Sequence, residues 1–130
     1  MKVLVTGGAG FIGANLVRSL ECTPEIGEVI VLDDFSSGSR QNLVGTQATV
    51  LNGSILDKSI LDRAFEGVSA VVHLAARSSV PRSIEDPMAT HEANATGTAM
   101  VLEAARRAGN GYVITASSSS VYGATTTLPK

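Results

Sequence analysis

Residues 3–20 read VLVTGGAGFIGANLVRSL, and this stretch decides the fold. A short apolar run leads into three glycines spaced three residues apart, Gly7, Gly10 and Gly13. An amphipathic segment follows at once, so the pattern predicts a buried strand at 3–5, a glycine turn, and a helix from about residue 11 to residue 20. A glycine turn between a strand and a helix is typical of a loop that binds phosphate groups.

Each glycine of this turn has its own expected role. Gly7 supplies the tight turn off the strand, Gly10 lets the backbone approach a pyrophosphate, and Gly13 lets the helix pack closely on the sheet. The helix then directs its free N–H groups and the positive end of its dipole at the phosphates. No lysine follows, so this is not a nucleoside-triphosphate loop, and a turn made only for close packing remains the alternative interpretation.

An acidic residue ends the next apolar run, which covers Glu28–Leu32. Asp33 lies 20 residues after Gly13, where a dinucleotide-binding unit carries an acid that accepts hydrogen bonds from the adenosine ribose. A carboxylate at this place also repels a 2′-phosphate. We therefore expect NAD rather than NADP, with Arg40 in the following loop as the residue that would offset the charge.

The rest of the chain alternates strand-like and helical segments. Apolar strands separated by helices indicate a parallel sheet that is covered on both faces. We expect an α/β fold, a Rossmann-type doubly wound sheet of five strands in the order 3-2-1-4-5, in one domain over residues 1–130. The remaining elements are expected at Thr49–Leu51, Asp57–Phe65 with Asp57 as the N-cap, Ala70–Leu74, Pro87–Ala108 and Tyr112–Ala116.

Composition restricts the class of protein. The chain has 130 residues, a net charge of -2 and no basic run, so neither nucleic acid nor a membrane surface is an expected partner. One cysteine, Cys22, excludes an internal disulfide, and the histidines His73 and His91 show no metal-ligand spacing, so no metal is expected. No apolar run approaches a membrane span and no signal peptide is recognisable, which makes the cytoplasm the default location.

Five motifs, TGGAGFIG, LDDFSSG, HLAA, NATGT and SSSSVYG, follow one another along the chain. In their order and spacing the sequence resembles the extended short-chain dehydrogenase/reductases, and most of all the NAD-dependent sugar-nucleotide epimerases and dehydratases. The resemblance covers nearly the whole chain. It implies an NAD-dependent UDP-sugar epimerase, with a dehydratase or reductase of the same family, or an NAD-binding module without catalysis, as alternatives.

The resemblance also implies which residues bind NAD. They follow the cofactor from the pyrophosphate through the adenosine to the nicotinamide ribose. These residues are Gly7, Gly10, Phe11, Ile12, Gly13, Asp33, Asp34, Ser36, Gly38, Ser54, Ile55, Leu74, Ala75, Ala76 and Asn94.

Some positions depart from the family or have an ordinary structural explanation. Ser54 stands where the family usually has Asp beside the adenine, so a weaker contact is expected. Asn94 buttresses the site in the family, with a helix-surface amide as the alternative. His73 is interpreted as a hydrogen-bonded strand-end histidine rather than a base. Arg77 and Arg82 flank a loop that faces the sugar nucleotide in the family, where each would meet a phosphate or only solvent.

SSSSVYG carries the visible catalytic signal. It follows the fifth expected strand, at the sheet edge where parallel α/β proteins bind ligands. In the resembling enzymes a Ser or Thr four residues before the tyrosine of VYG, here Tyr122, hydrogen-bonds the substrate oxygen. That position is Ser118, with Ser119 and Ser120 as candidates if the register slips.

The general acid/base pair of the family, Tyr-x-x-x-Lys, does not occur in these 130 residues. Tyr112 is followed four residues later by Ala116, and Tyr122 by Thr126. We therefore expect an N-terminal part of a longer enzyme, with a natural short nucleotide-binding protein as the alternative. A homodimer is expected, through the edge of the fifth strand or through the long helix at 87–108.

Overall fold

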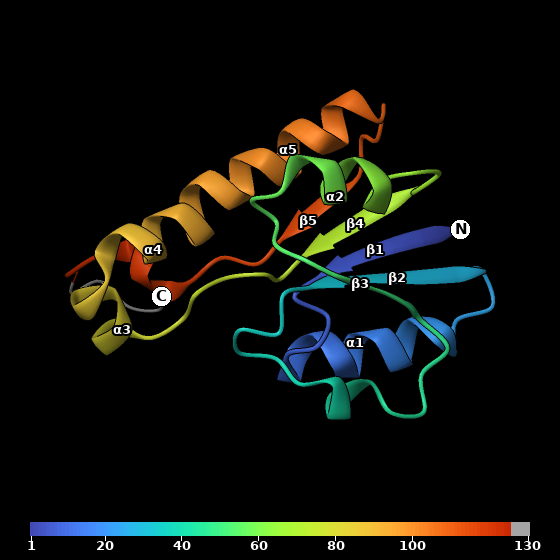
Figure 1. Cartoon of the computed structure of the whole chain (residues 1–130), viewed down its shortest axis with the longest axis horizontal. Helices are drawn as coiled ribbons and strands as arrows, with labels where there is room; N and C mark the ends of the chain where they lie inside the picture. The colour runs from blue at the N-terminus through green and yellow to red at the C-terminus, as the bar shows by residue number, and fades with distance from the viewer. Residues whose placement is uncertain (126–130) are drawn as a thin grey trace.

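A parallel sheet with the strand order β3-β2-β1-β4-β5 forms the centre of the computed structural model, which describes residues 1–125 (Figure 1). The predicted fold class and strand order are confirmed, and every predicted strand lies within one residue of its expected ends. Residues 126–130 of the predicted domain lie outside the described residues. The strands are β1 (Lys2–Thr6), β2 (Glu28–Asp33), β3 (Thr49–Asn52), β4 (Ala70–His73) and β5 (Val113–Thr115).

Helices cover both faces of the sheet, as Figure 1 shows, with α1 on one side and α2 and α5 on the other. None of the helices within residues 1–125 is long and apolar enough to cross a bilayer. The helical elements are α1 (Phe11–Glu21), η1 (Arg40–Leu43), α2 (Lys58–Ala64), α3 (Val80–Glu85), α4 (Pro87–His91), η2 (Glu92–Thr96), α5 (Gly97–Arg107) and η3 (Ser119–Tyr122).

The two layers bury separate apolar clusters because alternate side chains of a strand point to opposite faces. Leu4 of β1 packs in the cluster that contains Leu61 of α2, and this cluster also holds the buried face of α5. Val5, the next residue of β1, packs with Val17 of α1 on the other face. The sheet is therefore held at a fixed distance from both helical layers, and the carboxyl ends of its strands meet at one edge.

The long helix predicted for Pro87–Ala108 is divided in the structure. It consists of α4, one π-helical stretch (η2), and α5. Thr98 donates a hydrogen bond from its hydroxyl to the carbonyl of Asn94 at 2.7 Å, which satisfies a backbone oxygen where the helix widens. Helix α3 was also not predicted, because its segment was interpreted as a turn; Ser79 caps it by accepting from the amide of Arg82 at 3.5 Å.

Asp57 is the N-cap of α2, as the sequence predicts. Its carboxylate accepts hydrogen bonds from the amide of Ser59 at 2.8 Å and from the amide of Ile60 at 3.4 Å. These bonds, together with one from the Ser59 hydroxyl at 2.8 Å, stabilise the ionised form and lower the pKa of Asp57. The start of α2 is therefore set by a local signal that the sequence alone carries.

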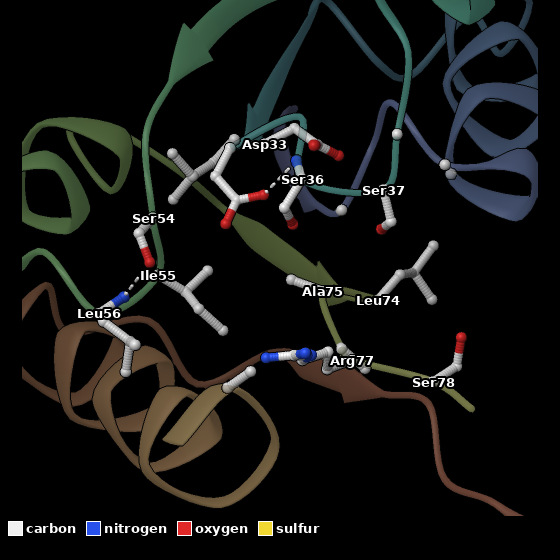
Figure 2. Close-up of a pocket in the computed structure, with 18 of the residues that line it drawn as sticks. Asp33, Ser36, Ser37, Ser54, Ile55, Leu56, Leu74, Ala75, Arg77 and Ser78 are labelled. Atoms are coloured by element: carbon white, nitrogen blue, oxygen red, sulfur yellow. Dashed lines mark hydrogen bonds between the residues drawn. The ribbon is translucent and has the colours of Figure 1, made fainter. Parts of the chain in front are cut away.

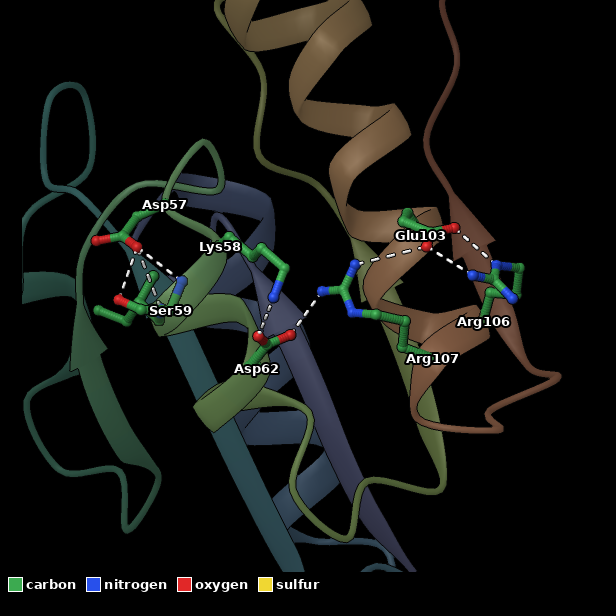
Figure 3. A network of polar contacts seen from close by, with 8 residues as sticks. Asp57, Lys58, Ser59, Asp62, Glu103, Arg106 and Arg107 are labelled. Carbon is green, nitrogen blue, oxygen red and sulfur yellow. Dashed lines mark hydrogen bonds and ion pairs between the residues drawn. The ribbon is translucent and has the colours of Figure 1, made fainter.

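A network of surface ion pairs joins α2 to α5 (Figure 3). Asp62 lies between Lys58, at 2.8 Å, and Arg107 of α5, at 2.5 Å. Glu103 pairs with Arg106 at 2.7 Å, and Arg107 also faces Glu103 at 3.7 Å. The cations lower the pKa of both carboxyls. Because these groups are solvated, each pair adds little to stability, and the apolar contact beneath carries the packing.

Candidate functional site

A cleft of about 1020 Å³ lies at the carboxyl edge of the sheet, where β1, β2 and β4 end. Figure 2 shows Asp33, Ser36 and Ser37 on one side, Ser54 to Leu56 on another, and Leu74, Ala75 and Arg77 between them. Every predicted cofactor-binding residue except Asn94 lines this cleft. The volume is at the upper end of the range for small-molecule and cofactor sites.

The glycine turn brings the end of β1 against the chain that leaves β4. Gly7 has φ +70°, and a Cβ there would lie 2.7 Å from the amide nitrogen of Ala75. Gly13 is equally constrained, because its Cβ would collide with the carbonyl oxygen of Gly7. Gly13 thus permits close contact between the helix and the turn, whereas the sequence predicted close contact with the sheet. Gly10 is less constrained, because a Cβ there would meet one atom within 4 Å, the Gly7 oxygen, in a tight contact of 3.3 Å.

The start of α1 is shaped for an anion. Its N-cap is Gly10, so no side chain caps the helix, and its first turn holds no acidic residue. The first amides of a helix lack acceptors within the helix and carry the positive end of its dipole. Phe11 and Ile12, whose amides belong to this turn, line the cleft. The cradle around Gly10 therefore leaves the first helix amides open to the cleft, and their binding of a pyrophosphate stays a prediction.

Asp33 ends β2 at the opposite side of the cleft and is 8% exposed. Its Oδ2 accepts a hydrogen bond from the amide of Ala9 at 2.9 Å, and Oδ1 accepts one from the amide of Phe35 at 2.8 Å. Two carboxylate oxygens have about four lone-pair positions, so acceptor capacity is left for a ribose hydroxyl. Asp33 therefore holds the glycine turn in place and also presents a negative charge to the cleft.

Arg40 does not bring its charge into the cleft. Its guanidinium carbon lies 4.3 Å from the centre of the Phe35 ring, in a cation–π contact. Phe35 itself has φ +58°, a backbone conformation that residues other than glycine rarely adopt. The arginine that the sequence offered as a counterweight to Asp33 is therefore stacked on the loop, and the charge beside the ribose position remains that of Asp33.

Ser54 follows β3 and faces the same end of the cleft. Its oxygen accepts a hydrogen bond from the amide of Leu56 at 3.1 Å, which forms a small turn (Figure 2). Ile55, buried in this turn, packs in the cluster beneath the sheet edge and leaves only 8% of its surface exposed. Within residues 1–125 the Ser54 hydroxyl only accepts a hydrogen bond and donates none. Its hydrogen can therefore be donated to a ligand.

Asn94 lies behind the cleft wall instead of lining it. Its Oδ1 accepts from the amide of Arg77 at 2.7 Å, and its Nδ2 donates to the carbonyl of Arg77 at 3.0 Å. A side-chain amide that pairs with both backbone groups of one residue fixes that residue as a strand neighbour would. The buttressing role that the sequence predicted for Asn94 thus has a structural basis in this clamp on the chain after β4.

His73 is a hydrogen-bonded strand-end histidine, as predicted, and does not line the cleft. It is 3% exposed, and its ring contacts the hydroxyls of Thr6 and Thr98. Burial lowers the pKa of the imidazole, because the charged form is poorly solvated inside the protein. Burial therefore favours the neutral ring of His73.

Two arginines reach the cleft from the chain after β4. Arg77 pairs with Asp86 at 3.5 Å, while Arg82 lines the cleft from α3 without an ion pair among the described residues. The long helix adds Ala89, Glu92 and Ala93, which the sequence analysis did not identify. The sequence signal that could have identified two of them is the four-residue spacing of Ala89 and Ala93, which places both on one helix face.

Ser118, the predicted catalytic residue, is not among the residues that line the cleft. It is exposed and caps η3, with its Oγ accepting from the amide of Ser120 at 3.2 Å and donating to the hydroxyl of that residue at 3.1 Å. Ala116, at the end of β5, lines the cleft two residues earlier. Within residues 1–125, no three His, Cys, Asp or Glu side chains gather in a way that could hold a metal ion.

Comparison with known proteins identifies a family for this architecture. Residues 3–130 match the model of the NAD dependent epimerase/dehydratase family. The UDP-glucose 4-epimerase of Erwinia amylovora is 39% identical over 99% of this chain, and the aligned part is 40% of that protein. The chain thus spans about 40% of the length of this curated relative.

Solved structures agree. The UDP-glucose 4-epimerase of Brucella ovis, in complex with NAD, superposes with a TM-score of 0.90 at 35% identity, covering 98% of this chain and 39% of its own. A dTDP-glucose 4,6-dehydratase from Streptomyces venezuelae, with NAD bound, is 42% identical with a TM-score of 0.81, covering 87% of this chain and 38% of its own.

Proposed function

The chain belongs to the NAD dependent epimerase/dehydratase family, and from that premise we propose that it is the NAD-binding part of an NAD-dependent UDP-sugar epimerase. The observation that carries the proposal is the meeting of three features in one cleft. They are the uncapped start of α1, the carboxylate of Asp33, and the chain after β4, which lies against Gly7. Pyrophosphate, adenosine ribose and nicotinamide ribose each have a matching surface there.

Each part of the cleft has a proposed task. The amides at the start of α1 bind the pyrophosphate, and Asp33 accepts hydrogen bonds from the adenosine ribose. Ser36 and Ser54 flank the adenine end. The small side chains of Ala75 and Ala76 let the nicotinamide ribose approach the sheet. A carboxylate on the ribose side disfavours a 2′-phosphate, which supports NAD over NADP.

NAD, when bound, would accept hydride from a sugar carbon and return it to the opposite face of that carbon, which gives the epimer. The resemblance assigns Ser118 the task of orienting the sugar hydroxyl that loses its proton, whereas in this structure its Oγ caps η3 and does not line the cleft. The proton acceptor of the family, a tyrosine activated by a lysine four residues later, is not among these residues. We therefore expect the 130-residue chain to bind NAD without turning over UDP-glucose.

The assembly and location are also part of the proposal. Apolar side chains remain exposed on two surfaces that could pair with a second copy: Leu102 on α5 is 48% exposed, and Ile114 on β5 is 67% exposed. Exposed apolar side chains on an edge strand or helix face favour association. A cytoplasmic homodimer acting on nucleotide sugars, with no role for nucleic acid or membrane, fits this surface and the net charge of -2.

A nucleotide-sugar dehydratase is the second candidate. It is supported by the Streptomyces venezuelae dehydratase, which is 42% identical and covers 87% of this chain. A reductase of the same family and an NAD-binding module without catalysis are the remaining alternatives. Incubating the longer protein with UDP-glucose and dTDP-glucose separates these activities, because an epimer, a dehydrated 4-keto sugar and no product are distinct by mass and NMR.

Calorimetric titration with NAD tests the binding proposal. Gly10→Ala should preserve the fold, since Gly10 has φ -75°, but its methyl group enters the space meant for the pyrophosphate. We expect NAD affinity to fall at least about tenfold. Gly111→Ala is the matched control, because a Cβ there meets nothing within 4 Å and Gly111 does not line the cleft. Wild-type protein that releases no heat with NAD, or a Gly10→Ala variant with unchanged affinity, would refute the proposal.

A further inference from the structure

The ring of His73 lies between two hydroxyl groups where β4 ends. Thr6 Oγ1 is 2.6 Å from Nδ1, and Thr98 Oγ1 is 3.0 Å from Nε2. The neighbour in register on β5 is Thr115. The side chains that β1, β5 and the long helix place beside this ring are thus uncharged threonines, and burial alone shifts its pKa.

The hydrogen bonds determine which ring nitrogen carries the proton. The hydroxyl of Thr98 has one hydrogen, which it donates to the carbonyl of Asn94 at 2.7 Å, so it can only accept from His73. Nε2 is therefore protonated. Nδ1 of the neutral ring is then an acceptor and receives the hydroxyl hydrogen of Thr6, whose oxygen accepts from the amide of Ala75 at 3.4 Å.

These bonds run in one direction from the Ala75 amide to the Asn94 carbonyl, and Asn94 in turn clamps both backbone groups of Arg77. This series of hydrogen bonds, here called the relay, therefore begins and ends at the same segment. That segment, Leu74–Arg77, is here called the β4 exit, and it forms one wall of the cleft. Protonation of His73 would put a hydrogen on Nδ1 against the Thr6 hydroxyl and break the relay in the middle.

We propose that His73 is a positioning residue whose neutral ring, protonated at Nε2, holds the β4 exit against η2 so that the cleft accepts the nicotinamide half of NAD. The identity of this ligand rests on the proposed function. The adenosine half of the cleft is formed by the residues after β2 and β3, and within residues 1–125 no hydrogen bond joins these residues to the relay. The relay therefore affects one half of the dinucleotide and not the other.

Thr98→Val tests the relay, because valine keeps the shape of threonine and removes the hydroxyl. We expect NAD affinity to fall about tenfold, while the affinity for ADP, which lacks the nicotinamide half, stays unchanged. Exchange of the Arg77 amide with solvent should become faster. Thr98→Ser retains the hydroxyl and should restore both quantities. Thr96→Val, on an exposed position at the end of η2, is the matched control and should behave as the wild type.

Imidazole ¹⁵N spectra of the wild-type protein provide a test that needs no variant and no ligand, and we expect the Nε2–H form for His73. A dominant Nδ1–H form, or equal losses of NAD and ADP affinity in Thr98→Val, overturns the proposal. If the wild type binds no NAD, the proposed function fails, and the relay is judged by the spectra and by Arg77 exchange. Unchanged exchange in Thr98→Val then counts against it.

Discussion

The carboxylate of Asp33 accepts a hydrogen bond from the amide of Ala9 at 2.9 Å, which ties the end of β2 to the glycine turn after β1. The same carboxylate binds the amide of Phe35 at 2.8 Å. One side chain therefore shapes both loops that border the adenosine end of the cleft. In the proposed function it also accepts hydrogen bonds from the ribose hydroxyls. Its structural role and its role in cofactor recognition therefore use the same two oxygens.

Asp33→Asn should weaken both roles. Asparagine keeps one acceptor oxygen and places an NH₂ group against a backbone amide, which costs about 1–3 kcal/mol of unfolding free energy. We expect NAD affinity to fall more than tenfold, with a smaller loss for NADP, so the preference between the cofactors narrows. Chemical denaturation and paired titrations measure these effects. Glu25→Gln removes a carboxylate charge before β2, away from the cleft, and should change neither the unfolding free energy nor the affinities for NAD and NADP. A stronger preference for NAD over NADP in Asp33→Asn would contradict the assignment.

Gly7→Ala should be far more damaging than Gly109→Ala. Both glycines have φ near +70°, so each alanine bears backbone strain on the order of 1 kcal/mol. Only at Gly7 does the new Cβ also meet backbone, 2.7 Å from the Ala75 nitrogen, whereas a Cβ at Gly109 meets nothing within 4 Å. Thermal unfolding compares the two variants directly. Equal losses would mean that the turn moves away from β4 without cost.

Stability should decrease as the pH falls below the ordinary pKa of histidine, 6.5. Burial lowers the pKa of His73 in the folded state, so below pH 6.5 the unfolded chain binds more protons than the folded one. The contribution of His73 to the free energy of unfolding is complete above pH 6.5. It is lost as the pH falls toward the pKa of the folded state, by at most about 1.4 kcal/mol per pH unit. Urea unfolding from pH 8 to pH 5 measures it.

Two variants assign this pH dependence to a residue. His73→Asn removes the titrating group, so the slope between pH 7 and pH 5 should become shallower. His91→Asn removes the other histidine, which is exposed at the end of α4, and should leave the slope unchanged. A slope that persists in His73→Asn would show that another group dominates.

Self-association can be assigned to one of two surfaces. Ile114→Lys places a charge on the exposed edge of β5, and Leu102→Lys places one on the exposed face of α5. Light scattering at micromolar concentration should show a dimer for the wild type and a monomer for the variant whose surface forms the interface. A wild-type monomer under these conditions counts against the homodimer.

Much of this architecture follows from local patterns. The alternation of Leu4 with its valine neighbours, the glycines of the first turn and the carboxylate of Asp57 each act within a few residues. For that reason the strands were predicted from the sequence, and their order followed from the doubly wound sheet that they indicated. Most of the predicted cleft residues were instead implied by the resemblance to the epimerase and dehydratase family. The cap at Asp57 needs only the amides of Ser59 and Ile60, so the local sequence supplies all of its backbone partners.

Contacts between distant residues were beyond these patterns. Thr6 and His73 are 67 positions apart, and Arg77 meets Asn94 across 17. The widening of the long helix at η2 and the stacking of Arg40 on Phe35 likewise depend on which groups the fold brings together. Ser118 illustrates the same limit, because a motif specifies its neighbours in sequence but not whether its hydroxyl faces the cleft.

The sequence by itself determined that a parallel sheet ends in a glycine turn with an acid one strand away, because hydrophobic periodicity and glycine conformation are local properties. Only the tertiary structure decided that Asp33 also holds that turn, that Asn94 clamps the β4 exit and that burial favours the neutral ring of His73. Hydrogen-bond direction and burial depend on the partners that the fold supplies, and no short window of sequence contains both partners.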